Sequence, residues 1–408
     1  MGGVSAVSAR ITRYHDGRAP DLLERKYAAM AASPFAFYRG SCQLFGDAWP
    51  ARTALNDTPP IWSCGDLHFE NLGCYKGDNR LVYFDLNDFD EAAILPVSWD
   101  LTRFAASVLV GARQLRVTET DAAELATRYL DAFAAALAWG KARWVERDTA
   151  TGMVRGLLDA VRARKRKTLL NERTKEKGDR RRIRVDGVKA LVASRDDTAR
   201  VTKLVERLGD ELGKKKFYRV LDVARRVAGC GSLGLARWVV LVEGKGSPRG
   251  NYLLDLKEAR APASTGESPY KQPRWKSDAE RIVAVQRRVQ AVNPALLASL
   301  NMNGRGFVLR ELQPLQDRMR MEAWGGDREN LRDAMTTMGH VTAWAALRAS
   351  GREGSAIADD LIAFAGDRGW KRGVLAMARR VADRTLAEWR NFRADVAVGR
   401  VAAVELNA

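Results

Sequence analysis

The chain has 408 residues, 46% of them hydrophobic, and a formal net charge of +18. This length is typical of two or three domains or of one two-lobed enzyme, and the charge predicts an anionic partner: a nucleotide, a phosphorylated substrate, nucleic acid or a membrane surface. Four cysteines without C-x-x-C spacing and only three histidines exclude a disulfide framework and a His-rich metal site.

We expect no targeting signal in the N-terminal part. No apolar run approaches the ~20 residues of a membrane span, and MGGVSAVSARITRYHDG lacks the apolar core of a signal peptide. We therefore expect a soluble, cytoplasmic protein. We expect residues 1–20 to be frayed, and residues 21–32 predict a helix capped by Asp21. In the aromatic-rich residues 35–45, Arg39 has two open interpretations: contact with a phosphate, or an ion pair with an acid of the loops that follow.

Residues 61–101 hold the densest group of acid and amide side chains. Two short apolar runs, residues 72–75 and 81–84, flank the polar turn KGDN and predict a β-hairpin. The hairpin brings the loop at 66–71 beside the loop at 85–91. Like charges so close repel one another unless a cation or a phosphate-bound metal lies between them.

The spacing within the first loop is specific. Asp66 and Asn71 stand in the D-x-x-x-x-N relation of phosphotransferase catalytic loops, where the Asp accepts the proton of the substrate hydroxyl and the Asn holds magnesium. An EF-hand calcium loop starting at Asp85 is excluded, because its position 6 would be Asp90 and its position 12 would be Pro96.

Other side chains of this stretch have simpler interpretations. His68 is expected to form a structural hydrogen bond rather than to act in catalysis. Cys64 and Cys74 are expected to be thiols of the core.

Two helices and a basic run follow. Apolar periodicity predicts helices at residues 99–115 and 121–145, under the acidic loops. Residues 162–184 hold twelve Lys or Arg residues against three acids. Such a run is commonly a solvated helix or a mobile loop. Binding of an anionic substrate is a second interpretation. Nucleic-acid binding is a weaker third, because aromatic stacking partners are missing.

Residues 214–261 change to strand-like patterns. Residues 220–227 and 237–242 flank the glycine-rich AGCGSLG, and residues 252–256 form a third strand that ends on Lys257. A Rossmann fingerprint would open a helix after its glycines, whereas a second strand follows here. Glycines at 229, 231 and 234 with Ser232 let backbone N–H groups approach phosphates, and Lys257 would pair with phosphate oxygens. An ordinary hairpin with a surface lysine is the alternative.

The remaining chain predicts a helix at residues 277–292, capped by Ser277 or Asp278, and a strand at residues 306–312 followed by Gln-Pro-Leu. Residues 331–347 and 359–391 predict two long amphipathic helices.

Several of these motifs together resemble a known superfamily. GDLHFEN at 65–71 resembles the GDxHxxN loop of aminoglycoside and choline kinases, within the protein-kinase-like superfamily. LNDFDEA at 86–92, running to WDL at 99–101, resembles the IDFDxA…DLA stretch of the same superfamily. The resemblance implies that Asp88 holds metal and that Asp100 is a buried anchor. Asp85 and Asp90 stay open as alternative metal ligands.

A closer resemblance is to a family of uncharacterised bacterial proteins, domain of unknown function 2252. The segments FYRG at 37–40, GDLHFEN, FDLNDFDE at 84–91 and VAGCGSLG at 227–234 fit its pattern over roughly residues 20–350. This resemblance implies no particular substrate.

The kinase-like resemblance has further implications. It implies that Glu280 is the acid that positions Lys257, with Gln286 as a neutral alternative. It also implies that residues 306–315 form the hinge between the lobes, beside the adenine of the nucleotide. The order of the motifs is unusual, because the loop at residue 65 precedes the glycine-rich turn at residue 229. A circular permutation accounts for this order, since termini and loops lie on protein surfaces.

We therefore expect an α+β, protein-kinase-like, two-lobed fold that is circularly permuted, with a small antiparallel-sheet lobe and a large, mainly helical lobe. The expected parts are a helical catalytic lobe at 1–212, a β-rich nucleotide-binding lobe at 213–315 and C-terminal helices at 316–408. The expected function is phosphoryl transfer from ATP with Mg²⁺ to a hydroxyl, on a small acceptor that the sequence does not identify. A nucleotide-binding pseudokinase and an AMP transferase are alternatives. A nucleic-acid-binding protein is a weaker one.

Overall fold

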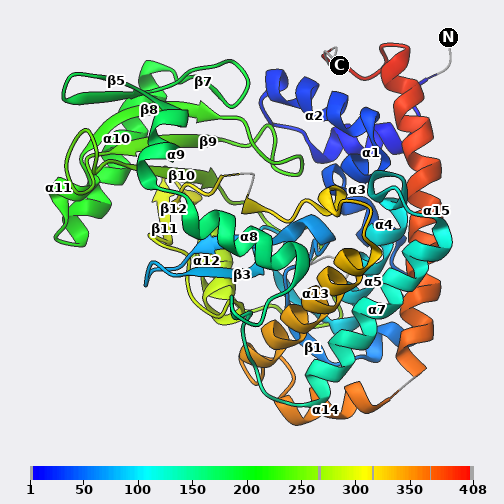
Figure 1. Ribbon diagram of the computed structural model, residues 1–408. Coiled ribbons are helices and arrows are strands. Elements are labelled where there is room, and N and C mark those ends of the chain that lie inside the picture. Colours follow the sequence, from blue (N-terminus) through cyan, green and yellow to red (C-terminus); the bar gives the residue numbers. More distant parts are fainter. Residues whose placement is uncertain (1–2, 265–267, 315–316, 368, 405–408) are drawn as a thin grey trace.

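The computed structural model describes residues 3–404 except residues 265–267, 315–316 and 368. Over these residues the chain combines long helices with antiparallel sheets, so the expected α+β class is confirmed. One part is built on a six-stranded sheet, drawn in green and yellow in Figure 1, and the other on long helices that include α5, α7, α13 and α15. No helix in the described part is long and apolar enough to cross a membrane.

The large sheet has the strand order β11-β12-β10-β9-β8-β7, and each neighbouring pair is antiparallel. Its strands are β7 (Ala190–Val192), β8 (Val220–Arg226), β9 (Arg237–Val242), β10 (Tyr252–Glu258), β11 (Ala298–Met302) and β12 (Arg305–Glu311). The strands expected at 220–227, 237–242, 252–257 and 306–312 are therefore confirmed to within one or two residues.

Each face of this sheet is covered by different helices. Alternate residues of a strand point to opposite faces, and the face with Trp238, Val240 and Leu254 packs against α10 (Arg195–Glu211). The opposite face packs against α9 (Arg166–Arg173) and the hairpin of β5 (Thr174–Lys177) and β6 (Arg180–Ile183). The sheet part thus includes residues before the expected boundary at residue 212.

The basic run at residues 162–184 forms α9 and the β5–β6 hairpin. Most of its side chains are exposed, as the solvated interpretation predicts. Some of its arginines nevertheless have partners in the protein: for example, Arg164 forms an ion pair with Asp317, and the buried Arg181 forms one with Glu176. The hairpin has no alternation of apolar and polar residues, so no sequence pattern predicted it.

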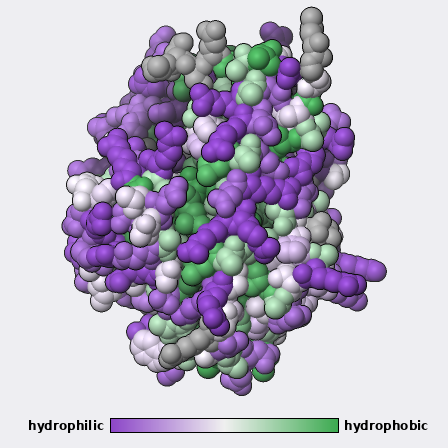
Figure 2. Space-filling view, turned by 90° about the vertical axis from the view of Figure 1, so that its right-hand side faces the viewer, coloured by the Kyte–Doolittle hydropathy of each residue, from purple (hydrophilic) through white to green (hydrophobic). Residues whose placement is uncertain are grey.

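The helical part has one large apolar core. Its main helices are α5 (Val97–Val110), α7 (Glu119–Ala138), α13 (Arg328–Arg348) and α15 (Gly369–Ala397). Helix α7 packs on α5 and α13, and α15 packs on α5. A capping box between Thr118 and Asp121 starts α7. Figure 2 looks onto the side that carries α15, where hydrophilic side chains cover most of the surface.

The shorter helices complete the helical part and flank the sheet. They are α1 (Ala6–Tyr14), α2 (Pro20–Ala32), α3 (Pro34–Gly40), α4 (Gln43–Ala48), α6 (Ala112–Leu115), α8 (Gly152–Ala163), α11 (Lys215–Tyr218), α12 (Asp278–Val289) and α14 (Ala358–Gly366).

Several expected boundaries are wrong. Residues 6–14 are helical, not frayed, because Val7 and Ile11 of α1 are buried against α15. Helix α2 begins with Pro20 in its first turn, so Asp21 lies inside the helix and does not cap it. The helix expected at 121–145 ends at Ala138. The single helix expected at 359–391 is two helices, α14 and α15.

Two small sheets carry the acidic loops. The expected hairpin is confirmed as β2 (Leu72–Lys76) paired with β3 (Val82–Leu86). Strand β1 (Pro60–Ser63) pairs antiparallel with β4 (Ala93–Pro96). The loop at 64–71 leaves β1 and enters β2, and the loop at 87–92 leaves β3 and enters β4. The two strand pairs therefore fix both ends of both loops next to each other.

Candidate functional site

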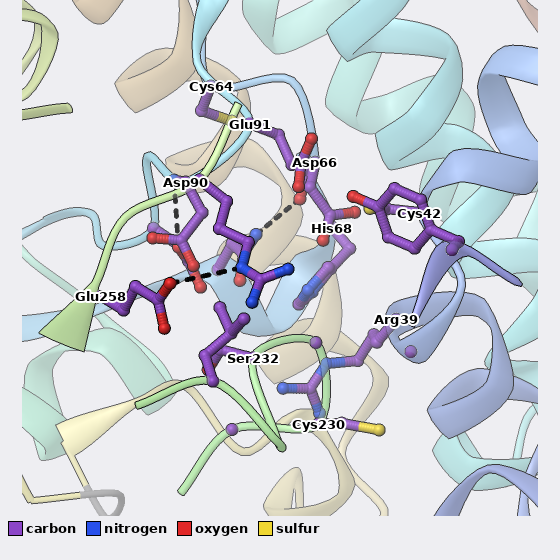
Figure 3. Close-up of a pocket in the computed structure, with 18 of the residues that line it drawn as sticks. Arg39, Cys42, Cys64, Asp66, His68, Asp90, Glu91, Cys230, Ser232 and Glu258 are labelled. Carbon is purple, nitrogen blue, oxygen red and sulfur yellow. Dashed lines mark hydrogen bonds and ion pairs between the residues drawn. The ribbon is translucent and has the colours of Figure 1, made fainter. Parts of the chain in front are cut away.

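A cavity of about 230 Å³ lies where the two acidic loops meet the glycine-rich turn between β8 and β9 (Figure 3). The end of α1 and the segment that joins it to α2 form a further wall of the cavity, with Tyr14 and Arg18. Among the described lining residues the charged ones are the acids Asp66, Asp88, Asp90, Glu91 and Glu258 and the arginines Arg18, Arg39, Arg260 and Arg318. The loops and the turn, which lie more than 130 residues apart in the chain, thus share one charged cavity.

The backbone of the turn that begins the first loop is hydrogen-bonded to Asp100 of α5. The carboxylate of Asp100 accepts hydrogen bonds from the backbone N–H groups of Cys64 (3.1 Å) and Gly65 (3.2 Å). Gly65 has φ +77°, and a Cβ there would lie 2.0 Å from the carbonyl oxygen of Glu91. Only glycine fits this close approach of the two loops. Asp100 is buried, as expected of an anchoring residue.

Asp66 projects into the cavity beside a buried cation. Its carboxylate accepts a hydrogen bond of 2.6 Å from Nε of Arg103, whose guanidinium stacks on the ring of Tyr38. Burial raises the pKa of Asp66 to about 6, although the charge of Arg103 lowers it. Asp66 is therefore largely ionised at neutral pH, and its pKa is near enough to 7 for the carboxylate to accept a proton.

Asn71 is oriented by the loop itself. Its side-chain nitrogen donates a hydrogen bond to the backbone carbonyl of Asp66. The amide oxygen therefore remains as its acceptor atom, and Asn71 lines the cavity with Asp66.

His68 and Arg39 support the loop. Nδ1 of the buried His68 accepts a hydrogen bond of 3.2 Å from the backbone N–H of Glu70, and burial holds the pKa of His68 well below its ordinary value. This is the structural role expected of it. Arg39 forms an ion pair with Glu70 and also lines the cavity. The ion-pair interpretation of Arg39 is confirmed, and contact with a phosphate stays a prediction. Cys64 and Cys74 are buried thiols, as expected.

The second acidic loop, at residues 87–92, is connected to the six-stranded sheet by an ion pair. Lys257 of β10 forms an ion pair with Asp90. The backbone N–H of Asp90 donates to the carboxylate of Asp88 (3.4 Å). Burial by itself would raise the pKa of Asp88, but neighbouring cations, Lys257 foremost, hold it below its ordinary value. Asp88 is therefore an anion, and its carboxylate lines the cavity.

Two candidate residues lie elsewhere. Asp85 is buried beneath the hairpin, where it forms an ion pair with Arg348 (3.0 Å) and accepts a hydrogen bond from the backbone N–H of Ala291 (3.0 Å). Glu280 accepts a hydrogen bond of 2.7 Å from the backbone N–H of Lys276, next to Ser277, the N-cap of α12. Neither lines the cavity. Asp85 is therefore no metal ligand of this cavity, and the acid that pairs with Lys257 is Asp90 and not Glu280.

Helix α12 still contributes to the site through another residue. The guanidinium of the buried Arg281 donates hydrogen bonds to the carbonyl oxygens of Ala92 (2.6 Å) and Asp90 (2.9 Å). These bonds fix the backbone of the second loop. The neutral alternative, Gln286, is buried and does not line the cavity.

The glycine-rich turn is held from its outer side by the N-terminal segment. Gly229 (φ +79°) and Gly234 (φ +91°) take backbone angles that favour glycine. The buried Lys26 donates hydrogen bonds to the carbonyl oxygens of Cys230 (3.1 Å) and Gly231 (2.7 Å). Gly229, Gly231 and Ser232 line the cavity, whereas Gly234 packs against Arg18 outside it.

The sequence did not reveal several lining residues. Tyr14 and Arg18 belong to a segment expected to be frayed, although the i, i+4 spacing of Val7 and Ile11 was a signal for its helix. Arg260 and Arg318 are single arginines in polar stretches, and no local pattern marks them. Among the described residues, none forms a hydrogen bond or an ion pair with the side chain of Arg318.

The residues that line the cavity suit magnesium, which is bound partly by water and phosphate, better than a metal ion that is bound only by protein side chains. No group of three or more His, Cys, Asp or Glu side chains among the described residues is arranged to hold a metal ion. Magnesium usually keeps several waters and uses one or two protein oxygens together with substrate phosphates. The amide oxygen of Asn71 and the carboxylate of Asp88 match that demand, while Asp90 is occupied by Lys257.

The fold and the cavity define a mixed α and β protein with a charged site between a sheet and two acidic loops. The chain belongs to the family described as uncharacterized protein conserved in bacteria (DUF2252), which matches residues 18–395. Comparison with curated proteins and with solved structures finds no match.

Proposed function

We propose that this protein is a magnesium-dependent phosphotransferase of protein-kinase-like, circularly permuted fold, which transfers a phosphoryl group from ATP to the hydroxyl of a small acceptor. One observation carries the proposal: the glycine-rich turn shares one cavity with Asp66, Asn71 and Asp88, and Lys257 forms an ion pair with Asp90, which lines the same cavity. These are the parts that phosphoryl transfer uses, because its loose transition state needs positioning and charge stabilisation more than covalent help.

Each residue has a role in the proposed reaction. The acceptor oxygen bonds to the γ-phosphorus, the bond from that phosphorus to the β–γ bridging oxygen breaks, and ADP leaves. Asp66 takes the hydroxyl proton, for which a pKa of about 6 suits it. Asn71 and Asp88 would hold magnesium, which supplies positive charge to the phosphates. Backbone N–H groups of the turn and Lys257 would contact phosphate oxygens.

The order of elements in the sheet supports the kinase-like interpretation. Strand β8, the glycine-rich turn, β9, the lysine strand β10, helix α12 and then β11 and β12 follow one another as the resemblance implies. The acidic loops precede this unit in the chain, which is the order that a circular permutation produces. Permutation requires only that the joined ends lie at the surface.

The test is transfer of label from γ-³²P-ATP with magnesium, with metabolite extracts as the source of acceptor. We expect labelled product or slow release of labelled phosphate, and at least a 100-fold loss in Asp66→Asn. Asp78→Asn is the matched control, because Asp78 lies exposed in the β2–β3 turn. If ATP binds but neither transfer nor hydrolysis is detected, the result would favour a pseudokinase. Mass spectrometry of the product separates a phosphoryl from an adenylyl adduct.

A further inference from the structure

A second, larger cavity adjoins the candidate site. This outer cavity measures about 640 Å³ and lies beside the six-stranded sheet, between the start of α10 and the β11–β12 turn. The two cavities share four lining residues, which are Arg18, Leu235, Arg260 and Glu258, the last of them labelled in Figure 3. A volume of about 300–1,000 Å³ is typical of sites for small organic molecules. The outer cavity therefore has room for a second substrate beside the phosphates.

The outer cavity extends along the sheet face that packs against α10. Trp238 lines it and belongs to that face, whereas Lys257 lies on the opposite face, because neighbouring positions of a strand point to opposite sides. Phosphates that contact Lys257 therefore lie on the side of the sheet away from α10. The segment expected beside adenine borders a separate cavity of about 200 Å³ through residues 311–314, and this cavity shares no described lining residue with the outer one. A nucleoside bound there leaves the outer cavity to the acceptor.

Arginines dominate the charged lining of the outer cavity. The charged residues of its described lining are Arg18, Arg200, Arg225, Arg237, Arg260 and Arg305 with the acids Asp197 and Glu258. Asp197 accepts a hydrogen bond of 2.5 Å from Arg200. Glu258 accepts one of 3.1 Å from Arg305. Both acids are thus already bonded to an arginine, and the excess of positive charge in the lining attracts an anion.

Two of these six arginines differ from the others, because their guanidinium groups are hydrogen-bonded to no carboxylate of the described residues. Arg18 donates to the backbone carbonyl oxygens of Gly231 (2.9 Å) and Leu233 (3.3 Å). Arg260 forms an ion pair with Glu258, with 3.5 Å between Nε and the carboxylate oxygen, but its side chain makes no hydrogen bond within the described chain. The other four arginines are each hydrogen-bonded to a carboxylate. Arg18 and Arg260 are also the two that line both cavities, so their charge lies where the cavities meet.

We propose that the acceptor is a small hydroxylated anion whose carboxylate or phosphate group binds Arg18 and Arg260, a proposal that rests on the phosphotransferase function proposed above. The planar donors of a guanidinium group match the oxygens of both kinds of anion. Asp66 lines the same cavity as the two arginines, so a short carbon skeleton reaches from them to the base. The acceptor hydroxyl gives its proton to Asp66, and its oxygen bonds to the γ-phosphorus as ADP leaves. The remainder of a larger acceptor lies in the outer cavity.

Fractionation of a metabolite extract tests the charge of the acceptor. The extract is passed over an anion-exchange resin, and the retained compounds are eluted with a volatile salt and dried. The full chain then receives the retained or the unretained compounds together with γ-³²P-ATP and magnesium. We expect label to be transferred to compounds of the retained fraction. Transfer only to unretained compounds overturns the anionic acceptor while the proposed phosphotransferase stands, and transfer in neither fraction contradicts both.

Variants of Arg260 test the contact with the retained fraction as the source of acceptor. Arg260→Gln should raise the KM for the acceptor about tenfold and that for ATP less than about twofold, since a charge-assisted hydrogen bond to the acceptor is lost. The exchange keeps the backbone carbonyl of Arg260, which accepts a hydrogen bond of 2.9 Å from Arg281. Arg260→Lys keeps the charge and should recover part of the loss.

Arg320→Gln is the matched control, because Arg320 is exposed and pairs with Glu322 on the surface, and it should change neither KM. A rise in the KM for ATP as large as that for the acceptor would assign Arg260 to the nucleotide and overturn the proposal. No change in Arg260→Gln beyond that of the control also contradicts it.

Discussion

Lys257 on strand β10 forms an ion pair with Asp90 in the loop after β3, across 167 residues of chain. The pair ties the sheet to the acidic loops at the edge of the candidate site. The charge of the same ammonium group lowers the pKa of Asp88. In the proposed reaction the same ammonium group contacts phosphate oxygens.

Replacement of Lys257 tests whether this ammonium group serves the ligand. Lys257→Met should lower the rate of phosphoryl transfer by about 100-fold or more, since a charge that stabilises the phosphates is lost. The free energy of unfolding should fall by only about 1 kcal/mol, because the pair is partly exposed. Transfer assays and urea titrations measure the two effects. Lys245→Met, at an exposed lysine after β9, should change neither, and equal rates in both variants would refute the role.

A glycine exchange tests the close approach of the two loops. Gly65→Ala should destabilise the protein by about 3–5 kcal/mol, because its Cβ meets the carbonyl of Glu91 and its φ is positive. Gly178→Ala, in the β5–β6 turn, also has a positive φ but meets no atom within 4 Å, so it should cost only about 1–2 kcal/mol. Chemical denaturation of both variants gives the comparison. Similar losses would show that the contact with Glu91 is absent.

The pH dependence of transfer tests Asp66 as the base. A base acts when it is deprotonated, so the rate should rise with pH and level off above a pKa of about 6. Arg103 lowers this pKa. Arg103→Gln should therefore move the acidic limb of the profile to higher pH, and Arg103→Lys should move it less. A profile that is flat from pH 5 to 8, or a shift toward lower pH in Arg103→Gln, would contradict the assignment.

The buried Lys26 should make stability depend on pH. Burial lowers its pKa from 10.5 to about 7. Between these two values the unfolded chain binds more protons than the folded chain, so this residue makes stability rise with pH from about 7 to 10.5. Denaturation at pH 7 and pH 9.5 should show the wild type gaining stability relative to Lys26→Met. An unchanged or reversed difference would show that Lys26 is not buried beneath the glycine-rich turn.

The local parts of the site followed from the sequence because their signals are local. Two apolar runs around a polar turn predict the β2–β3 hairpin, and this hairpin brings the loop of Asp66 beside the loop of Asp88. Strands β8, β9 and β10 were predicted from short apolar runs bounded by glycines. The pattern Ser277-x-x-Glu280 is that of a capping box, and it explains why Glu280 turns to its own helix and not to Lys257.

The remaining parts depend on contacts between distant segments. Leu170 and Ile183 stand among charged residues, and their packing onto the sheet has no local signature. Likewise, the contact of Lys26 with the glycine-rich turn joins residues about 200 positions apart. Arg318 reaches the cavity because its backbone pairs with Gly73 in a short β-bridge, which no sequence pattern predicts. Three-dimensional packing, not propensity, positions these residues.

The most direct test of the shared cavity is a thermal-shift measurement with saturating Mg·ATP on the wild type, Asp88→Ala and the control Asp78→Ala. Ligand at about 100 times its Kd stabilises a protein by about 2.7 kcal/mol, which raises Tm by a few degrees. We expect this rise in the wild type and in Asp78→Ala, and none in Asp88→Ala. No rise in the wild type with any nucleoside triphosphate, or an equal rise in Asp88→Ala, would contradict a phosphate site between the acidic loops and the sheet.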